Sequence, residues 1–429
     1  MFRGAESKTV ADGVRAGYSR GRTENSRAPG AHRVPRRGEN VTVSDIPISV
    51  DTAPSGPAPL QATNVAKQFT RSDGQVVNAL NDVSLTIGHG EMIVLLGPSG
   101  CVKTTLLRCV AGLEYPDAGT MHLAGRLVYD PVAKVALPAN RRDINMMFQS
   151  YALWPHMTLV DNVAYPLRVA GVSRTAARAR AMEYLDLVGI SQLGKQYASQ
   201  VSGGQQQRAA LARTLVSEPA LVLFDEPLSN VDAKVRHTLR AEISRLHHEL
   251  RFAALYVTHD QSEAMALGDR VAVMNAGEIR EFAKPTDLYA RPTTRFAAEF
   301  LGSTNILPAQ LLSEDATSVR VRADIVGEIT LSSALTSSQR DASGIAIVWR
   351  PENTLLAPAG AATPEAHVSI TGTVVNSVYA GTHTDFTVVT TEGRELHAWL
   401  PGIDSYRAFD DGDPVSIGVP TFAIQLIAN

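Results

Sequence analysis

The chain has 429 residues, 44% of them hydrophobic and 19% charged, and at about 150 residues per domain this length predicts two or three folded domains. A net charge of −3 gives no whole-molecule argument for nucleic acid or an anionic surface as partner. The two cysteines, Cys101 and Cys109, are too few for a disulfide framework and lack zinc-ligand spacing, which favours a reducing compartment such as the cytosol.

Residues 1–58 are rich in Gly, Ser, Pro, Arg and Thr and show neither helical nor strand periodicity. Such a segment buries too little apolar surface to offset chain entropy, so we expect a disordered tail. A basic arm and an over-extended start site are alternative interpretations. No run approaches the roughly 18 apolar residues of a membrane-spanning helix, and the tail lacks the apolar segment of a secretory signal.

Residues 59–292 alternate short apolar strands with helical stretches, which predicts an α/β domain with a mostly parallel sheet. Ala, Leu and Arg recur at helical spacing over Ser173–Val188 and Gln205–Val216, so we expect a helical subdomain at about 150–216.

Residues 293–429 are β-rich and predict a small all-β barrel or sandwich. Its expected strands are rich in β-branched residues and are separated by Gly, Pro and Asp turns. They include Ser318–Ile325, Val368–Val375, Thr384–Val389 and Phe422–Ile427.

A phosphate loop is predicted where the apolar strand Met92–Leu96 leads into a Gly-rich turn and a helix. Backbone N–H groups of such loops converge on phosphates, the lysine reaches the β- and γ-phosphates, and the following hydroxyl holds Mg²⁺. Val102 stands where the strict pattern has glycine. The candidate ATP-binding residues are Gly97, Pro98, Ser99, Gly100, Cys101, Val102, Lys103, Thr104 and Thr105.

A second short apolar strand, Leu221–Phe224, ends in the two carboxylates Asp225 and Glu226. A buried strand of this kind places Asp225 beside the Mg²⁺ shell, and Glu226 at its tip polarises a water for attack on the γ-phosphate. Taken alone, this segment can be explained as a strand that happens to end in two acids. That explanation does not account for its occurrence together with the phosphate loop.

Between these motifs, Val201–Arg208 opens a helix with a serine and two glycines, which makes an anion-binding helix N-terminus. The ordered set of motifs resembles the ATP-binding subunits of ABC transporters, with Val201 in place of the leucine of their signature motif. The resemblance implies a P-loop (RecA-like) core and ATP contacts from Ser202, Gly203, Gly204 and Gln205.

The resemblance assigns further residues. Gln149 matches the Q-loop, which senses Mg²⁺ and the attacking water and touches the membrane partner. Ser229–Asp232 resembles the D-loop that crosses the dimer interface, with Asp232 among the nucleotide-site residues. His259 matches the switch histidine at the γ-phosphate, although a lone strand-end histidine is usually structural. Phe69 stands where the family stacks an aromatic on adenine.

The stretch Ser150–Thr158 resembles the importer subfamily that serves sugars, polyamines, ferric iron and phosphonates. Val348–Glu352 and Tyr379–Gly381 look like that subfamily's oligonucleotide-barrel-like (TOBE) regulatory domain. Because the segments carry no basic aromatic platform, no nucleic-acid partner is expected.

The resemblance implies an ATPase that uses ATP and Mg²⁺, pairs head to tail with a second copy, and lies peripherally on the cytoplasmic face of the inner membrane. There it drives two permease subunits fed by a solute-binding protein. Trp154 and the segment near Asn305 favour ferric iron or polyamine over sugars.

Two alternatives remain open: a soluble ABC ATPase outside transport, and a regulatory subunit impaired in ATP binding. The second rests on Val102: if this position needs a positive φ or a close approach of the phosphate, a β-branched residue there costs about 1–3 kcal/mol.

Overall fold

The structure is a computed structural model that describes residues 56–70, 74–98, 103–229, 231–315, 317–332, 344–361 and 367–428. The tail predicted at residues 1–58 therefore lies almost wholly outside the described residues. So do four residues of the predicted phosphate loop, Ser99, Gly100, Cys101 and Val102.

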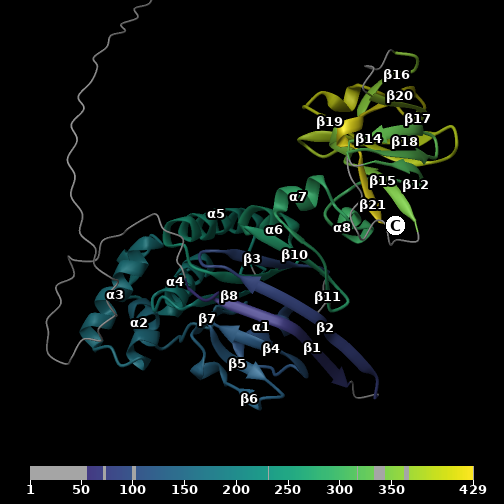
Figure 1. Ribbon diagram of the computed structural model, residues 1–429. Coiled ribbons are helices and arrows are strands. Elements are labelled where there is room, and N and C mark those ends of the chain that lie inside the picture. The colour runs from purple at the N-terminus through teal and green to yellow at the C-terminus, as the bar shows by residue number, and fades with distance from the viewer. Residues whose placement is uncertain are drawn as a thin grey trace, which may run out of the picture. The chain divides into compact units, whose positions relative to one another are not determined.

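A six-stranded sheet forms the centre of the first domain (Figure 1). Neighbours from β10 to β7 run parallel, and β11 pairs antiparallel with β10 at the edge. The apolar runs of β3 and β9 are buried at every position, as parallel strands covered on both faces require. In spatial order the strands are β11 (Glu278–Ala283), β10 (Arg270–Asn275), β3 (Met92–Leu96), β9 (Ala254–Thr258), β8 (Leu221–Asp225) and β7 (Ile144–Met147).

A second, antiparallel sheet packs through α1 (Lys103–Ala111) against one face of the first. Leu106 and Leu107 of the helix join a single buried cluster with Leu60 and Leu80 of this sheet and Leu95 of β3. This packing fixes the helix whose first turn carries three candidate site residues, Lys103, Thr104 and Thr105. In spatial order the strands are β2 (Val76–Ile87), β1 (Leu60–Thr70), β4 (Ala118–Leu123), β5 (Arg126–Asp130) and β6 (Val135–Ala136).

Helices cover the other face of the six-stranded sheet. Each of them begins at a Ser, Thr or Asp side chain that accepts a backbone N–H of the first turn, which satisfies donors that a helix start leaves open. They are α2 (Leu159–Val169), α3 (Arg174–Leu187), α4 (Gly203–Leu215), α5 (Ala233–Leu250) and α6 (Gln261–Leu267).

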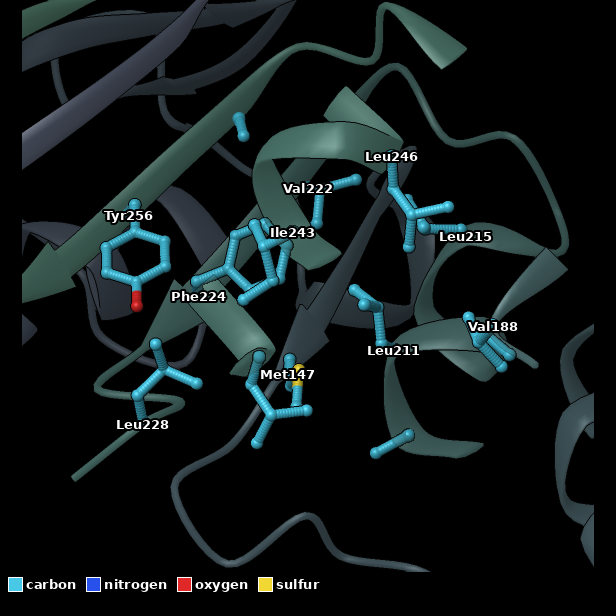
Figure 2. Packing of buried hydrophobic residues seen from close by; sticks show 14 of the residues in the cluster. Met147, Val188, Leu211, Leu215, Val222, Phe224, Leu228, Ile243, Leu246 and Tyr256 are labelled. Carbon is cyan, nitrogen blue, oxygen red and sulfur yellow. The ribbon is translucent and has the colours of Figure 1, made fainter. Parts of the chain in front are cut away.

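Figure 2 shows the core between this sheet face and these helices. Phe224 of β8 and Tyr256 of β9 lie with ring centroids 5.5 Å apart, in the same buried cluster as Leu246 of α5. Full burial of such side chains contributes about 1.5–3 kcal/mol each. The core therefore holds the ends of β8 and β9, where Asp225 and His259 lie, in a fixed place.

The β-rich region is preceded by two short helices, α7 (Pro285–Ala290) and α8 (Arg295–Phe300). It consists of two antiparallel five-stranded sheets that share one core around Trp349 and Phe386. One sheet is β14 (Gly327–Leu331), β13 (Val319–Ala323), β12 (Asn305–Glu314), β15 (Ile345–Trp349) and β21 (Gln425–Ala428). The other is β16 (Leu355–Pro358), β20 (Pro414–Pro420), β17 (His367–Tyr379), β18 (His383–Thr390) and β19 (Glu395–Pro401).

The last predicted strand begins later than expected. Phe422 lies in a 3-10 turn, Thr421–Ala423, with 82% of its surface exposed, and β21 starts only at Gln425. The turn follows Pro420, which cannot donate a backbone hydrogen bond to continue a ladder. None of the helices in the described part of the chain is long and apolar enough to span a membrane.

Candidate functional site

Three strand ends bring the candidate residues together at one edge of the six-stranded sheet. β3 ends at Leu96, β8 ends at Asp225, and β9 ends at Thr258, directly before His259. Asp225 pairs in register with Val257 of β9. Because the carboxyl ends of parallel strands share an edge, segments far apart in the sequence meet there, where α/β sheets bind ligands.

Lys103 begins α1 and is 4% exposed. Its ammonium donates to the carbonyl oxygens of Gly97, at 2.7 Å, and Pro98, at 3.1 Å. The lysine thus lies folded over the start of the phosphate loop. Charged hydrogen bonds of this kind contribute about 1.5–3 kcal/mol each, so a ligand must offer stronger acceptors to displace them.

Thr104, the next residue of α1, contacts the acid at the end of β8. Its hydroxyl donates to Asp225 Oδ1 at 3.2 Å. Burial raises the pKa of Asp225, while the hydrogen bond from Thr104 and the charge of Arg108 lower it, and the net shift is upward. A hydroxyl and a carboxylate oxygen therefore lie side by side, partly withdrawn from water.

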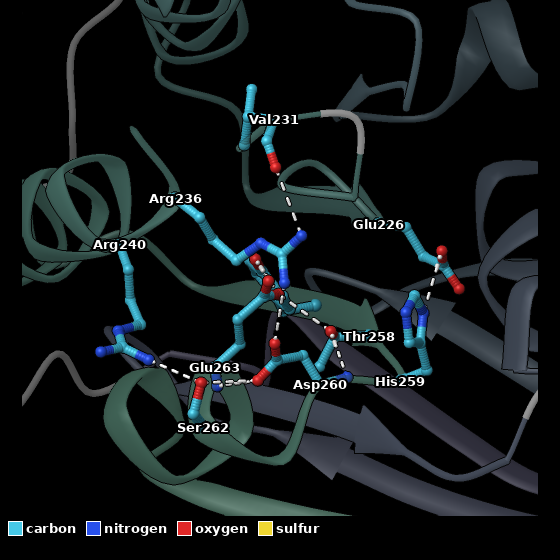
Figure 3. A network of polar contacts seen from close by, with 10 residues as sticks. Glu226, Val231, Arg236, Arg240, Thr258, His259, Asp260, Ser262 and Glu263 are labelled. Carbon is cyan, nitrogen blue, oxygen red and sulfur yellow. Dashed lines mark hydrogen bonds and ion pairs between the residues drawn. The ribbon is translucent and has the colours of Figure 1, made fainter. Parts of the chain in front are cut away.

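Glu226 and His259 form the second contact of the site. His259 Nδ1 lies 3.2 Å from Glu226 Oε2, and the two side chains are 49% and 25% exposed (Figure 3). Glu226 has φ of 46°, an uncommon conformation for a residue with a side chain, and its N–H donates to Val257 O at 3.1 Å. This strained turn directs the carboxylate out of the strand and towards the histidine.

Gln149 and Phe69 lie in segments at the periphery of this site. Gln149 is exposed in the turn that follows β7, whose Met147 pairs with Phe224 of β8. It therefore follows a strand that ends at the same sheet edge. Phe69 lies near the end of β1 in the other sheet, is 39% exposed, and has the ammonium of Lys67 5.3 Å from its ring centroid.

The signature residues form a helix start. Ser202 caps α4: Gln205 N donates to its hydroxyl at 3.4 Å, and Ser202 N donates to Gln205 Oε1 at 2.9 Å. A Cβ built on Gly203 meets nothing within 4 Å, so packing inside the chain does not require glycine there. Ser202, Gly204 and Gln205 line a hollow of about 380 Å³ together with residues of α5, the helix that Asp232 caps.

Several contacts around the site were missed by sequence reasoning. Gln207 is 2% exposed and donates to Pro227 O at 2.8 Å, which ties α4 to the turn after Glu226. Glu263 is 3% exposed and accepts hydrogen bonds from Tyr256, at 2.9 Å, and Thr258, at 2.8 Å. Burial raises the pKa of Glu263.

A sequence signal for part of this network exists. Asp260-Gln-Ser-Glu263 has the spacing of a capping box, and Glu263 N does donate to Asp260 Oδ1 at 3.1 Å. The glutamate side chain bonds the end of β9 instead, which the pattern does not predict.

Two family models match this chain. The ABC transporter model matches residues 80–229, and the TOBE domain model matches residues 347–427. Among curated relatives, an Fe(3+) ions import ATP-binding protein of Rhizobium etli is 42% identical over 77% of this chain and 88% of its own length. The chain belongs to the ATP-binding subunits of ABC importers. It is therefore an ATPase subunit, and the predicted family, fold class and enzyme activity are confirmed.

Other relatives of this ABC importer subunit are named for the import of Fe(3+) ions or of spermidine/putrescine. An Fe(3+) ions import ATP-binding protein of Rhizobium meliloti is 41% identical over 85% of this chain and 96% of its own. A spermidine/putrescine import ATP-binding protein of Frankia alni is 39% identical over 85% of this chain and 78% of its own. Among solved structures, a bacterial ABC transporter cassette in dimeric form is 29% identical, with a TM-score of 0.46, and covers 53% of this chain and 98% of that one.

Proposed function

We propose that this ATPase subunit hydrolyses ATP with Glu226 polarising the attacking water and His259 contacting the γ-phosphate. The observation that carries the proposal is the 3.2 Å contact between His259 Nδ1 and Glu226 Oε2, at the sheet edge where Lys103 and Thr104 also lie. A carboxylate within reach of a water can act as general base, and the histidine can hold both the carboxylate and a phosphate oxygen in place.

ATP binding is assigned to the loop Gly97–Thr105. Lys103 exchanges the carbonyls of Gly97 and Pro98 for the β- and γ-phosphate oxygens, which are stronger acceptors because they are charged. The loop N–H groups and the start of α1 supply positive potential for the phosphates. Phe69 is proposed to stack on adenine, which fits its exposed ring.

The residues around Thr104 suit Mg²⁺. Hydroxyl and carboxylate oxygens are its preferred ligands, and Thr104 Oγ1 lies 3.2 Å from Asp225 Oδ1. We assign the cation to Thr104 and Asp225, with Gln149 as a third contributor. Bound there, Mg²⁺ would neutralise phosphate charge. Burial of Asp225, which disfavours its carboxylate when alone, favours a bound cation beside it.

A second copy is proposed to complete each ATP site. Ser202–Gln205 present an open helix N-terminus, and the empty space beside Gly203 leaves room for a phosphate from another chain. Asp232 lies in the segment that would cross the interface of this head-to-tail dimer. ATP held between two chains would join them, and hydrolysis would release them.

Two permease subunits are the proposed membrane partners, which places the chain peripherally on the cytoplasmic face of the inner membrane. A hollow of about 220 Å³ lies beside the end of β7, and its lining includes Phe148, Trp154, Pro166 of α2 and Arg213 of α4. Phe148, one of its lining residues, directly precedes Gln149 in the sequence. A partner segment seated there would report its position directly to the ATP site.

Ferric iron or a polyamine is the proposed solute, delivered to the permeases by a binding protein. Support comes from the names of the relatives, which specify Fe(3+) in Rhizobium and spermidine/putrescine in Frankia. The test is uptake by vesicles that contain this chain with candidate permease subunits and a candidate binding protein, supplied with ferric iron, spermidine or maltose. Uptake of maltose alone would overturn the solute, and phosphate release unaffected by the permeases would overturn the importer role.

A further inference from the structure

Arg236, in the first turns of α5, joins two loops of the site (Figure 3). One guanidinium nitrogen, Nη1, lies 3.2 Å from Asp260 Oδ2, and the other, Nη2, donates to Val231 O at 3.3 Å. Val231 belongs to the Ser229–Asp232 segment, and Asp260 directly follows His259. A single planar side chain therefore links the backbone of one loop to the residue after the switch histidine.

Asp260 is itself held from several sides. Its Oδ1 accepts hydrogen bonds from Ser262 Oγ, at 2.6 Å, and Glu263 N, at 3.1 Å, and its own N–H donates to Thr258 Oγ1 at 3.0 Å. Thr258 in turn donates to the buried Glu263. Thr258 and Asp260, which flank His259, are both held by these hydrogen bonds. The backbone of His259 is therefore tied to the position of Asp260.

The Ser229–Asp232 segment also reaches the other catalytic candidate. Ser229 N and Oγ both donate to Glu226 O, at 3.2 and 2.9 Å. This one segment thus contacts Glu226 directly and His259 through Arg236. A movement of the segment changes the distance between the carboxylate and the imidazole, which now stands at 3.2 Å.

A purely structural role for Arg236 would be to hold α5 against α6. Arg240, one turn further along α5, provides such a link by donating to Ser262 Oγ at 2.8 Å. Arg236 differs because its partners are the loops themselves. Its Nε is buried and has no hydrogen-bond partner among the described residues, a cost that a simple helix-to-helix link does not require.

We propose that Arg236 is a positioning residue that transmits the state of the Ser229–Asp232 segment to His259. The proposal rests on the function above, in which this segment meets the second copy and His259 meets the γ-phosphate. When the second copy engages the segment, Val231 and Asp260 move as one through the guanidinium. Hydrolysis is thereby aligned only in the assembled dimer.

The test measures steady-state phosphate release against ATP concentration for wild type, Arg236→Ala, Arg236→Lys and the matched control Arg240→Ala. We expect Arg236→Ala to lower kcat by about tenfold or more, since misplacement of a catalytic group by about 1 Å has effects of this size. KM for ATP should change by less than about twofold, because the partners of Arg236 among the described residues, Val231 and Asp260, lie outside the phosphate loop. Arg236→Lys should recover part of kcat, since one ammonium can reach only one of the two acceptors.

Asp260→Asn and the double variant with Arg236→Ala extend the test. Two residues that act through one link should show non-additive losses, so the double variant should be little worse than either single one. If Arg236→Ala melts early, the kcat and KM of Arg236→Lys and Asp260→Asn decide the question instead.

The inference is overturned if kcat of Arg236→Ala stays within twofold of wild type, if Arg240→Ala loses as much, or if KM changes as strongly as kcat. The proposed function fails separately if the phosphate release of wild type does not exceed that of Glu226→Gln. The two failures are therefore distinguishable in one set of assays.

Discussion

Replacing Arg213 with leucine tests how the segment after Gln149 is held. Arg213 is 8% exposed, and its two terminal nitrogens donate to Tyr151 O and Ala152 O, each at 2.7 Å. Both acceptor residues have positive φ, 60° and 47°, which is unfavourable without such support. The guanidinium also lies 4.9 Å from the ring centroid of Trp154.

The magnitude follows from what leucine leaves behind. Two carbonyls lose a charged donor, at about 1–3 kcal/mol each, and the cation–π contact adds about 0.5–2 kcal/mol. Burial lowers the pKa of Arg213 to about 10, which shows that the charged guanidinium is partly desolvated in the folded state. Removing this buried charge recovers part of the folding free energy that the lost contacts cost. A net loss of about 3 kcal/mol remains, which corresponds to a fall in Tm of about 6–12 °C for a domain of this size.

The assay is thermal unfolding followed by calorimetry, with Arg180→Leu as control. Arg180 is 45% exposed and pairs with Glu183 and Glu218 on the surface, so its loss should cost at most about 1 kcal/mol. An Arg213→Leu variant with the Tm of wild type, or of Arg180→Leu, would refute the reasoning.

Three further predictions concern the same domain. Gln207→Leu should lower the free energy of unfolding by about 1–3 kcal/mol and reduce phosphate release, because Pro227 O loses its buried donor; unchanged values of both would contradict this. In a Cys101→Ser background, Cys109 should react with a disulfide reagent only after unfolding, since it is fully buried and burial raises its pKa to about 12; labelling of the native protein would disprove it. Val102→Gly should tighten Mg-ATP binding by about tenfold in a fluorescent-nucleotide titration, and equal affinities would show that this position does not demand glycine.

The strands that carry the site could be predicted because their sequences leave few alternatives. The Met92–Leu96 run is apolar throughout and occupies β3 with the same bounds, and the helix start predicted within Val201–Arg208 is the start of α4, which Ser202 caps. Parallel pairing then places strand ends at one edge whatever the detailed packing.

The connections between loops could not be predicted in this way. The sequence marks Asp260 as a helix cap but gives no sign that Arg236 is its partner, and their contact exists only once α5 and α6 are packed on one another. The left-handed conformation of Tyr151 and Ala152 is carried by residues that rarely adopt it, and it is supported by Arg213 from α4. Such features follow from tertiary structure and leave no periodic trace in the sequence.

Phosphate release by Glu226→Gln, measured beside equilibrium ATP binding, tests the assigned chemistry most directly. Glutamine keeps the shape and the contact distance to His259 but removes the carboxylate that polarises water. The account predicts a variant that binds Mg-ATP as tightly as wild type and releases almost no phosphate. A variant that binds normally and retains a substantial fraction of wild-type turnover would contradict the role given to Glu226.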